Sequence, residues 1–287
     1  MADKLKLILP KGRIQEKVLR LMTRIGLRFD ADARSYRPAC NDPEIEAKLL
    51  KPQNVPALVA LGRHDCGFTG RDWVMEQGAD VVELLDLGFD PVRLVAAVPE
   101  ALAAPGALLK RRLVVASEYR NLTLDYIRRK GLDAVFLQSF GATEALPPED
   151  ADMIVDNTAS GETLRWNRLS VVDELLRSTT RFVAHPGALQ DPWKKRKLDE
   201  LVMLMKSSIF ADEKVLLEMN VPSECFESLV RGLPCMRSPT VAPLHGDGGF
   251  AVKIAVPARD VRELIPRLVA AGARDILEYR LEKIVVG

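Results

Sequence analysis

Short apolar runs alternate with helix-like segments through the first two thirds of this chain of 287 residues. Helical spacing of apolar residues covers 14–25, which Gly26 ends, and 121–130, and a short helix is expected over 72–77. The runs between the helices are short enough for buried strands and are bounded by turn residues. We interpret six of them as strands: 5–9, 55–61, 94–98, 113–116, 135–137 and 153–155. This alternation predicts an α/β fold with mainly parallel sheets.

The pattern changes after His185. One long amphipathic helix is predicted over 191–214, with apolar residues at helical spacing. Strands are then predicted at 215–219, 240–244, 250–256 and 276–284, and helices at 223–229 and 261–271. This β-α-β-β-α-β order is the ferredoxin-like pattern, so the sequence predicts a separate small α+β domain at the C-terminal end.

Composition narrows the class of protein. The net charge is +1, with 47% hydrophobic and 28% charged residues, which is typical of a globular protein and gives no general attraction to nucleic acid. No apolar run approaches the roughly 18 residues that span a membrane, and residues 1–10 lack the apolar stretch of a signal peptide. We therefore expect a cytoplasmic protein with neither nucleic acid nor membrane as partner. Its three histidines show no zinc-ligand spacing, so no metal held by the protein alone is expected.

The segment from Met153 to Asn167 carries the strongest chemical signal. Its apolar start leads to Asp156, where a strand opens toward solvent and α/β sheets bind ligands. The residues from Thr158 to Thr163 are small and rich in hydroxyls, and Gly161 lets the backbone approach a ligand. Together with the free N–H groups of the next helix, they predict a phosphate pocket. The alternative is an ordinary helix cap, since the segment matches neither a Walker motif nor a dinucleotide fingerprint.

As a string of residues, this segment resembles a known family. DNTASGETLRWNRL (156–169) resembles the phosphoribosyl-diphosphate loop of ATP phosphoribosyltransferase, the first enzyme of histidine biosynthesis. Three more strings resemble that family in the expected order: LILPKGRI (7–14), GFTGRDWV (67–74) and LLDLGFDPVRLVAAVP (84–99). SPTVAPL (238–244) resembles the start of the regulatory domain found in its long form. The resemblance covers essentially the whole chain.

The resemblance implies a bilobal catalytic core, like that of periplasmic binding proteins, plus a C-terminal ferredoxin-like (ACT-like) regulatory domain. The matching boundaries are 1–90 with 183–211 for lobe I, 91–182 for lobe II with the loop, and 212–287 for the ACT-like domain. The implied reaction condenses ATP with 5-phosphoribosyl 1-diphosphate to N1-(5-phosphoribosyl)-ATP and diphosphate. Feedback inhibition by L-histidine is expected, with Mg2+ as a cofactor that travels with the diphosphate. The implied assembly is a homo-hexamer, with a dimer as the alternative.

The same resemblance implies which residues contact each substrate and the inhibitor. Asp156 is expected to accept hydrogen bonds from ribose and to favour positive charge on it, with Lys11 and Arg13 as further catalytic residues. The expected contacts of phosphoribosyl diphosphate are Asp156, Thr158, Ala159, Ser160, Gly161, Glu162 and Thr163. Glu162 is expected to offer only its N–H, because its carboxylate would repel phosphate. The expected contacts of ATP or diphosphate are Lys11, Gly12, Arg13, Arg71, Asp86 and Arg93. The expected contacts of histidine are Asn220, Thr240 and Ala273.

Structural interpretations stand beside several of these roles. For Lys11 and Arg13 the alternative is a solvated turn, although the family resemblance favours the functional role, and for Asp72 it is the N-terminal cap of a helix. Asp86 and Arg93 flank the expected crossover between the lobes, and for each of them the alternative to facing the nucleotide is a structural ion pair. Trp166 is expected to pack its helix rather than to stack on a base.

Two other classes of function remain open. A type I phosphoribosyltransferase for another base fits less well, because Asn157 stands where those loops carry a second acid. A non-catalytic cytosolic sensor of small molecules is the other alternative.

Overall fold

The computed structural model describes residues 4–30, 35–104, 106, 108, 111–236, 238–246 and 248–286. Backbone contacts divide the chain into two compact units. The first unit comprises Met1–Thr23 and Leu27–Leu198, and the second comprises Arg24–Gly26 and Asp199–Gly287. Within the described residues, no helix combines the length and the apolar character needed to cross a membrane.

A five-stranded sheet with the order β4-β1-β5-β12-β6 opens the first unit. Its strands are β1 (Leu5–Pro10), β4 (Ile45–Leu50), β5 (Cys66–Gly70), β6 (Val82–Asp86) and β12 (Thr180–Ala184). Strand β1 runs parallel to β4 and β5, whereas β12 runs antiparallel to β5 and β6. Its helices are α1 (Gln15–Arg24), α2 (Val55–Ala60) and α3 (Arg71–Gln77), and β2 (Phe29–Asp30) pairs separately with β3 (Ala39–Cys40).

The predicted strand at 55–61 is wrong, because this segment forms helix α2. Pro56 lies in the first turn of the helix, where its missing N–H leaves no bond unmade. Val55, Pro56 and Val59 are buried, which is a helical spacing rather than the alternation of a strand. A short apolar run does not distinguish the two conformations by itself.

A second five-stranded sheet has the order β11-β7-β10-β8-β9. Its strands are β7 (Val92–Pro99), β8 (Leu113–Ser117), β9 (Ala134–Gln138), β10 (Met153–Thr158) and β11 (Leu169–Ser178). Helix α4 (Arg120–Lys130) connects the parallel strands β8 and β9, and the short helix α5 (Glu162–Trp166) follows β10. Single 3₁₀ turns complete the described elements: η1 (Pro52–Asn54), η2 (Glu100–Leu102), η4 (Thr143–Ala145), η5 (Pro186–Leu189) and η6 (Ala258–Asp260).

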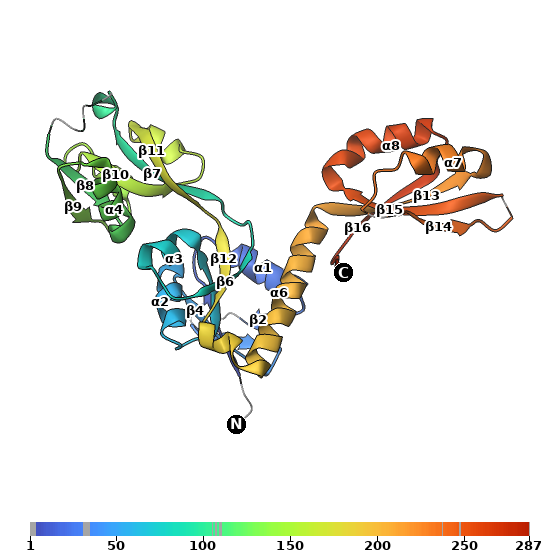
Figure 1. The fold of residues 1–287 in the computed structure, drawn as a ribbon, viewed down its shortest axis with the longest axis horizontal. Coiled ribbons are helices and arrows are strands. Elements are labelled where there is room, and N and C mark those ends of the chain that lie inside the picture. The colour runs from blue at the N-terminus through green and yellow to red at the C-terminus, as the bar shows by residue number, and fades with distance from the viewer. Residues whose placement is uncertain are drawn as a thin grey trace. The chain divides into compact units, whose positions relative to one another are not determined.

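The chain passes twice between these two sheets, from β6 to β7 and from β11 to β12 (Figure 1). The two passages lie side by side, because the N–H of Leu87 donates to the carbonyl oxygen of Thr180 at 3.0 Å and the N–H of Thr180 donates to that of Phe89 at 2.9 Å. Residues that are far apart in sequence therefore meet at this double crossing.

The second unit contains the predicted ferredoxin-like domain. Helix α6 (Pro192–Asp212) is the predicted long helix and continues from the first unit into the second. It is followed by β13 (Lys214–Pro222), α7 (Ser223–Arg231), β14 (Thr240–Pro243), β15 (Gly249–Pro257), α8 (Val261–Ala270) and β16 (Arg274–Arg280). The sheet order is β14-β15-β13-β16, with every pair antiparallel.

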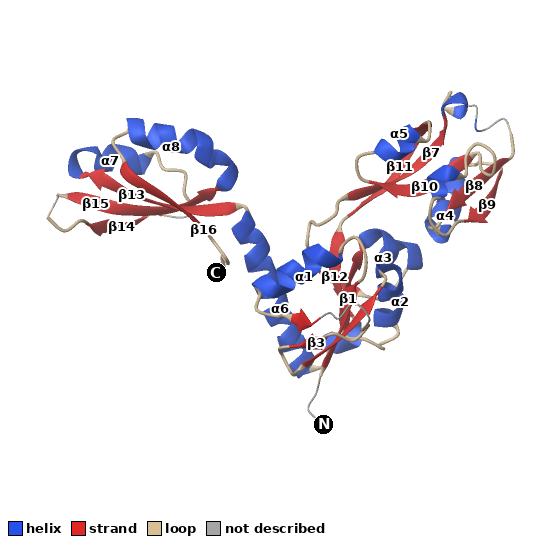
Figure 2. Cartoon of the chain, turned by 180° about the vertical axis from the view of Figure 1, so that it is seen from behind, coloured by secondary structure: helices blue, strands red, loops and turns tan. Residues whose placement is uncertain are grey.

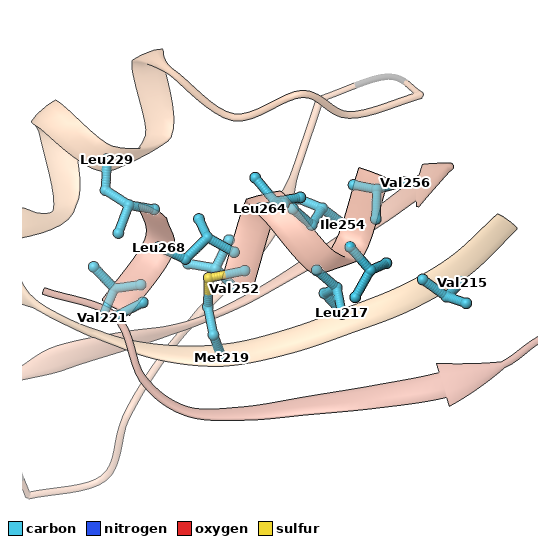
Figure 3. Packing of buried hydrophobic residues seen from close by; sticks show 12 residues of the cluster. Val215, Leu217, Met219, Val221, Leu229, Val252, Ile254, Val256, Leu264 and Leu268 are labelled. Carbon is cyan, nitrogen blue, oxygen red and sulfur yellow. The ribbon is translucent and has the colours of Figure 1, made fainter. Parts of the chain in front are cut away.

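One face of this sheet is buried under its helices. Figures 1 and 2 show α7 and α8 on the same face of the sheet. Alternate residues of β13 point into the core, where they meet apolar side chains of β15 and of both helices (Figure 3). The fold class is therefore confirmed: an α/β core with two sheets, followed by a ferredoxin-like α+β domain. The expectation of mainly parallel sheets is wrong, because β12 in the first sheet and β7 in the second run antiparallel to both of their neighbours.

Candidate active site

Strand β10 ends at the predicted phosphate loop, and residues of both line a pocket of 210 Å³, hereafter the loop pocket. The strand continues to Thr158, so the loop itself is only Ala159–Gly161, shorter than the sequence indicated. The pocket is lined by Arg13, Glu144, Asp156, Asn157, Thr158, Ala159, Ser160, Thr163 and Leu164. Because Arg13 follows β1, whereas Glu144 and the other lining residues lie between β9 and β11, the pocket draws on both sheets.

Hydrogen bonds within the loop fix its shape. The hydroxyl of Thr158 accepts from the N–H of Gly161 at 3.0 Å, and that of Ser160 accepts from the N–H of Glu162 at 3.3 Å. Gly161 has a φ of 80°, a left-handed conformation that favours glycine. Glu162 is exposed and does not line the pocket, so its carboxylate does not face a bound anion there.

Asp156 is half-buried in the loop pocket, and its Oδ1 accepts from the N–H of Asn157 at 2.7 Å. Burial, together with the nearby carboxylates of Glu144 and Glu118, raises the pKa of Asp156 to about 7 despite that hydrogen bond. The free site therefore holds this carboxyl at the boundary between its neutral and charged forms near neutral pH. A positive charge on a bound ligand would favour the charged form.

Four arginines surround a second pocket of 500 Å³ at the double crossing, hereafter the arginine pocket. It is lined by Arg71, Asp86, Pro91, Val92, Arg93, Ala159, Arg177, Ser178, Thr179 and Arg181. Ala159 lines both pockets, so the arginine pocket adjoins the loop pocket. The structure thus brings together the predicted residues Arg71, Asp86 and Arg93. Arg177 and Arg181 were not predicted, since only the pairing of β11 and β12 with their neighbours brings them here.

Carboxylates neutralise three of the four arginines. Arg181 pairs with Asp86 and with Glu83, at 3.2 Å for the latter. Arg93 and Arg177 share Glu174, at 3.4 and 2.7 Å.

Arg71 differs from the other three arginines. Among the described residues, no carboxylate lies within 4.0 Å of its guanidinium group, and the side chain is exposed. Within the arginine pocket, Arg71 is therefore the arginine most available to a phosphorylated ligand.

Lys11 and Gly12 lie apart from the lining of both pockets. The Nζ of Lys11 is 4.4 Å from the ring centroid of Tyr36 and donates to its hydroxyl at 3.4 Å. Gly12 has a φ of 105°, and its N–H donates to Gln15 at 3.3 Å. In this turn it is therefore Arg13 that the structure brings to the loop pocket, and a role for Lys11 remains a prediction.

Helix α3 carries two buried carboxylates that sequence analysis did not assign to a site. Asp72 accepts from the hydroxyls of Tyr119 and Ser178, each at 2.6 Å, so its interpretation as a cap is wrong. Glu76 accepts from the N–H groups of Asn121 and Leu122 at 2.9 and 3.0 Å. Both carboxylates tie α3 to the segment that begins α4. Their spacing of four residues on one helix face was the available signal in the sequence.

Two further details concern metal binding and Trp166. The described residues contain no group of three His, Cys, Asp or Glu side chains that could hold a metal ion. The loop pocket offers the carboxylates of Asp156 and Glu144, a donor set that suits magnesium bound mainly through ligand oxygens. Trp166 is 80% exposed, so its interpretation as a packing residue is wrong.

The predicted histidine contacts lie in the second unit. Asn220 on β13 faces away from the helices and donates to Asp275 at 3.0 Å. Thr240 lies on the same open face, because it pairs with the exposed Lys253 of β15. Strand β15 separates the two residues in the sheet, and they are offset by two residues along the strands, a distance of roughly 12 Å. Ala273 belongs to the core, so only its backbone is available beside Asn220.

Comparison with known proteins gives consistent matches. The family model for ATP phosphoribosyltransferase matches residues 51–207, and that for the HisG C-terminal domain matches residues 211–283. The ATP phosphoribosyltransferase of Thermodesulfovibrio yellowstonii is 40% identical over 291 residues, covering 99% of this chain and 100% of its own. That of Chlorobium phaeobacteroides is 39% identical over 286 residues, covering 98% and 97%. The solved ATP phosphoribosyl transferase (HisG:HisZ) complex from Thermotoga maritima has a TM-score of 0.63 and 27% identity, over 70% of this chain and 98% of that chain.

An α/β core that sets a hydroxyl-rich loop beside an arginine-lined pocket, in a chain with these relatives, defines a pentosyltransferase. The family model covers more than half of the chain, and the relatives match along nearly all of it. The chain belongs to the ATP phosphoribosyltransferase family, in the long form that carries the C-terminal domain.

Proposed function

We propose that the two adjoining pockets condense ATP with 5-phosphoribosyl 1-diphosphate to N1-(5-phosphoribosyl)-ATP and diphosphate. This reaction is the first step of L-histidine biosynthesis. The observation that carries the proposal is that Ala159 joins the loop pocket, which contains Asp156, to a pocket lined by arginines. One pocket suits a sugar phosphate, and the other suits the diphosphate or triphosphate of the second substrate.

In this mechanism, N1 of adenine forms a bond to the anomeric carbon of ribose while the bond from that carbon to the diphosphate oxygen breaks. The ribose gains positive charge during the transfer, and the Asp156 carboxylate favours that charge. Thr158, Ser160 and the loop backbone hold the 5-phosphate, and Arg71 and Arg13 bind the more distant phosphates. No nucleophile from the protein is needed, so positioning and charge provide the catalysis.

Magnesium is part of the proposal as an ion that arrives with the diphosphate. When bound, it neutralises charge on the leaving group. Glu144 and Asp156 are the carboxylates of the loop pocket that fit it, while most of its ligands come from the substrate.

Product formation from the two substrates tests the proposal, with Asp156→Ala as the key variant. We expect turnover to fall by at least about a hundredfold while the fold is retained, because a charge in contact with the reacting centre is removed. Asp133→Ala is the matched control, since the Asp133 side chain is 76% exposed and pairs only loosely with Arg112, at 3.9 Å. An unchanged rate for Asp156→Ala would contradict the proposed role. A chain that binds both substrates without turnover would instead be the non-catalytic sensor.

The open sheet face of the second unit is proposed to bind L-histidine and a further copy of the chain. Asn220 and Thr240 supply polar groups on that face, whereas Leu277 and Tyr279 on β16 are 51% and 43% exposed. Exposed apolar side chains on an open sheet favour association, which fits the predicted homo-hexamer or dimer in the cytoplasm. Asn220→Ala should weaken inhibition of the reaction by histidine without changing the uninhibited rate. Equal inhibition of the variant and the wild type would place the effector elsewhere.

The boundaries of the three domains belong to the same proposal. We propose lobe I as residues 1–90 with 183–211, lobe II as 91–182 and the regulatory domain as 212–287. The two sheets of the first unit support the two lobes, and the antiparallel sheet of the second unit supports the third domain.

A further inference from the structure

A chain of buried hydrogen bonds runs from the loop strand β10 to helix α3. The Nδ2 of Asn157 donates to the Tyr119 hydroxyl at 3.0 Å, which donates to Oδ2 of Asp72 at 2.6 Å. The Ser178 hydroxyl donates to Oδ1 of the same carboxylate at 2.6 Å. Tyr119, Asp72 and Ser178 are 0%, 5% and 2% exposed, so water does not compete for the two hydrogen bonds to Asp72.

The chemistry of the groups fixes the direction of this chain. Burial raises the pKa of Tyr119 far above its ordinary value, and the adjacent Asp72 adds to the rise, so the phenol keeps its single proton. That proton goes to Asp72, because an ionised carboxylate accepts hydrogen bonds only. Asn157 must therefore present its NH₂ group to Tyr119 rather than its oxygen. The side-chain oxygen of Asn157 therefore points away from Tyr119. Asn157 itself lines the loop pocket.

Close packing restrains Asp72 and Tyr119, which form the end of the hydrogen-bond series away from Asn157. A Cβ atom at Gly70 would lie 2.1 Å from Oδ1 of Asp72, so the carboxylate fills the space that a side chain at position 70 would need. The Tyr119 ring stacks on Trp73 with ring centroids 4.4 Å apart. Asp72 and Tyr119 are buried among these contacts, which restrict both side chains, so the orientation of Asn157 is favoured in advance of ligand binding.

We infer that Asp72 and Tyr119 are positioning residues that hold the Asn157 amide so that its oxygen accepts a hydrogen bond from a ribose hydroxyl of the phosphoribosyl substrate. This inference rests on the proposed function. An amide suits this place because it accepts a hydrogen bond without adding negative charge beside Asp156 and Asp72. Asn157 thereby becomes a substrate contact next to Asp156. Its orientation is determined by Asp72 on helix α3, which follows strand β5 of the first sheet.

Steady-state kinetics of Tyr119→Phe, Asn157→Ala and the double variant test this inference. Tyr119→Phe removes one hydroxyl and keeps the ring on Trp73. We expect each single variant to lower kcat/KM for phosphoribosyl diphosphate by about tenfold, the worth of one oriented hydrogen bond, while KM for ATP changes by less than about twofold. The double variant should be no worse than Asn157→Ala, because Tyr119 acts through Asn157.

Tyr126→Phe is the matched control. Tyr126 is also buried, at 5% exposure, and its hydroxyl bonds Asp173 at a place outside both pockets. Tyr126→Phe should change thermal stability about as much as Tyr119→Phe does, but its kinetics should equal those of the wild type.

Three outcomes would overturn the inference: unchanged kcat/KM in Asn157→Ala, equal loss toward both substrates, or multiplied losses in the double variant. If Tyr119→Phe does not fold, Asn157→Ala alone decides by the first two outcomes, because Asn157 is only half-buried. Absence of product from the wild-type protein would refute the proposed function instead.

Discussion

Replacing Asp156 by asparagine should stabilise the free protein, and only at the higher end of the pH range. A carboxyl whose pKa rises from 3.8 to about 7 on folding lowers the free energy of unfolding by up to about 4 kcal/mol above pH 7, at about 1.4 kcal/mol per pH unit. Solvent reaches part of Asp156 and screens this cost, so we expect about 2 kcal/mol. Asp156→Asn removes the charge and therefore the cost.

The sign follows from the protons bound by each state. Below about pH 4 the carboxyl is protonated in both the folded and the unfolded chain, so wild type and variant should be equally stable. Between about pH 4 and 7 the unfolded chain releases the proton while the folded protein keeps it, so the wild type loses stability as the pH rises. Above the folded pKa the difference is constant.

Urea unfolding followed by tryptophan fluorescence at pH 4 and pH 8 measures this difference. All three tryptophans, Trp73, Trp166 and Trp193, belong to the first unit, so the signal reports on the part that contains Asp156. The exposed Asp133→Asn is the control and should leave stability unchanged at both pH values. A gain for Asp156→Asn that is the same at pH 4 and pH 8 would refute the pKa reasoning.

Three further variants test the site and its support. Arg71→Gln should raise KM for a phosphorylated substrate about tenfold, because the Arg71 guanidinium lacks a competing carboxylate among the described residues. Initial rates measure KM, and an unchanged value would exclude a contact between Arg71 and the substrate. Gly161→Ala and the control Gly131→Ala should each lose about 1 kcal/mol of stability, since both glycines have positive φ with open space around the missing Cβ. Only Gly161→Ala should raise KM for phosphoribosyl diphosphate, and equal KM values for the two variants would contradict a role for the loop. Glu76→Gln should cost about 1–2 kcal/mol in urea unfolding by weakening charge-assisted bonds to two N–H groups of α4, and a stability equal to that of the wild type would show that the charge contributes nothing.

Much of the fold was predictable because it depends on local signals. The order of the C-terminal elements follows from alternation in strands such as β13 and from helical spacing in α7 and α8, and both patterns repeat over enough residues to be unambiguous. The strands β4, β6, β11 and β12 were missed. Their residues are only partly apolar: β11 is mostly half-buried or exposed, so its sequence lacks the apolar run of a core strand. Helix α2 was misassigned because six apolar residues fit either period.

For the site, the sequence by itself determined the loop chemistry: Asp156, the hydroxyls around Gly161 and the family to which they belong. Such information is local, since a phosphate loop needs small residues and free N–H groups that are close together in the chain. Only the tertiary structure decided which distant residues join that loop. Arg177 and Arg181 reach the arginine pocket through the antiparallel pairing at the double crossing, and Asn157 is oriented by Tyr119 and by Asp72 on helix α3. These contacts depend on strand register and side-chain packing between segments up to 106 residues apart, which no local pattern encodes.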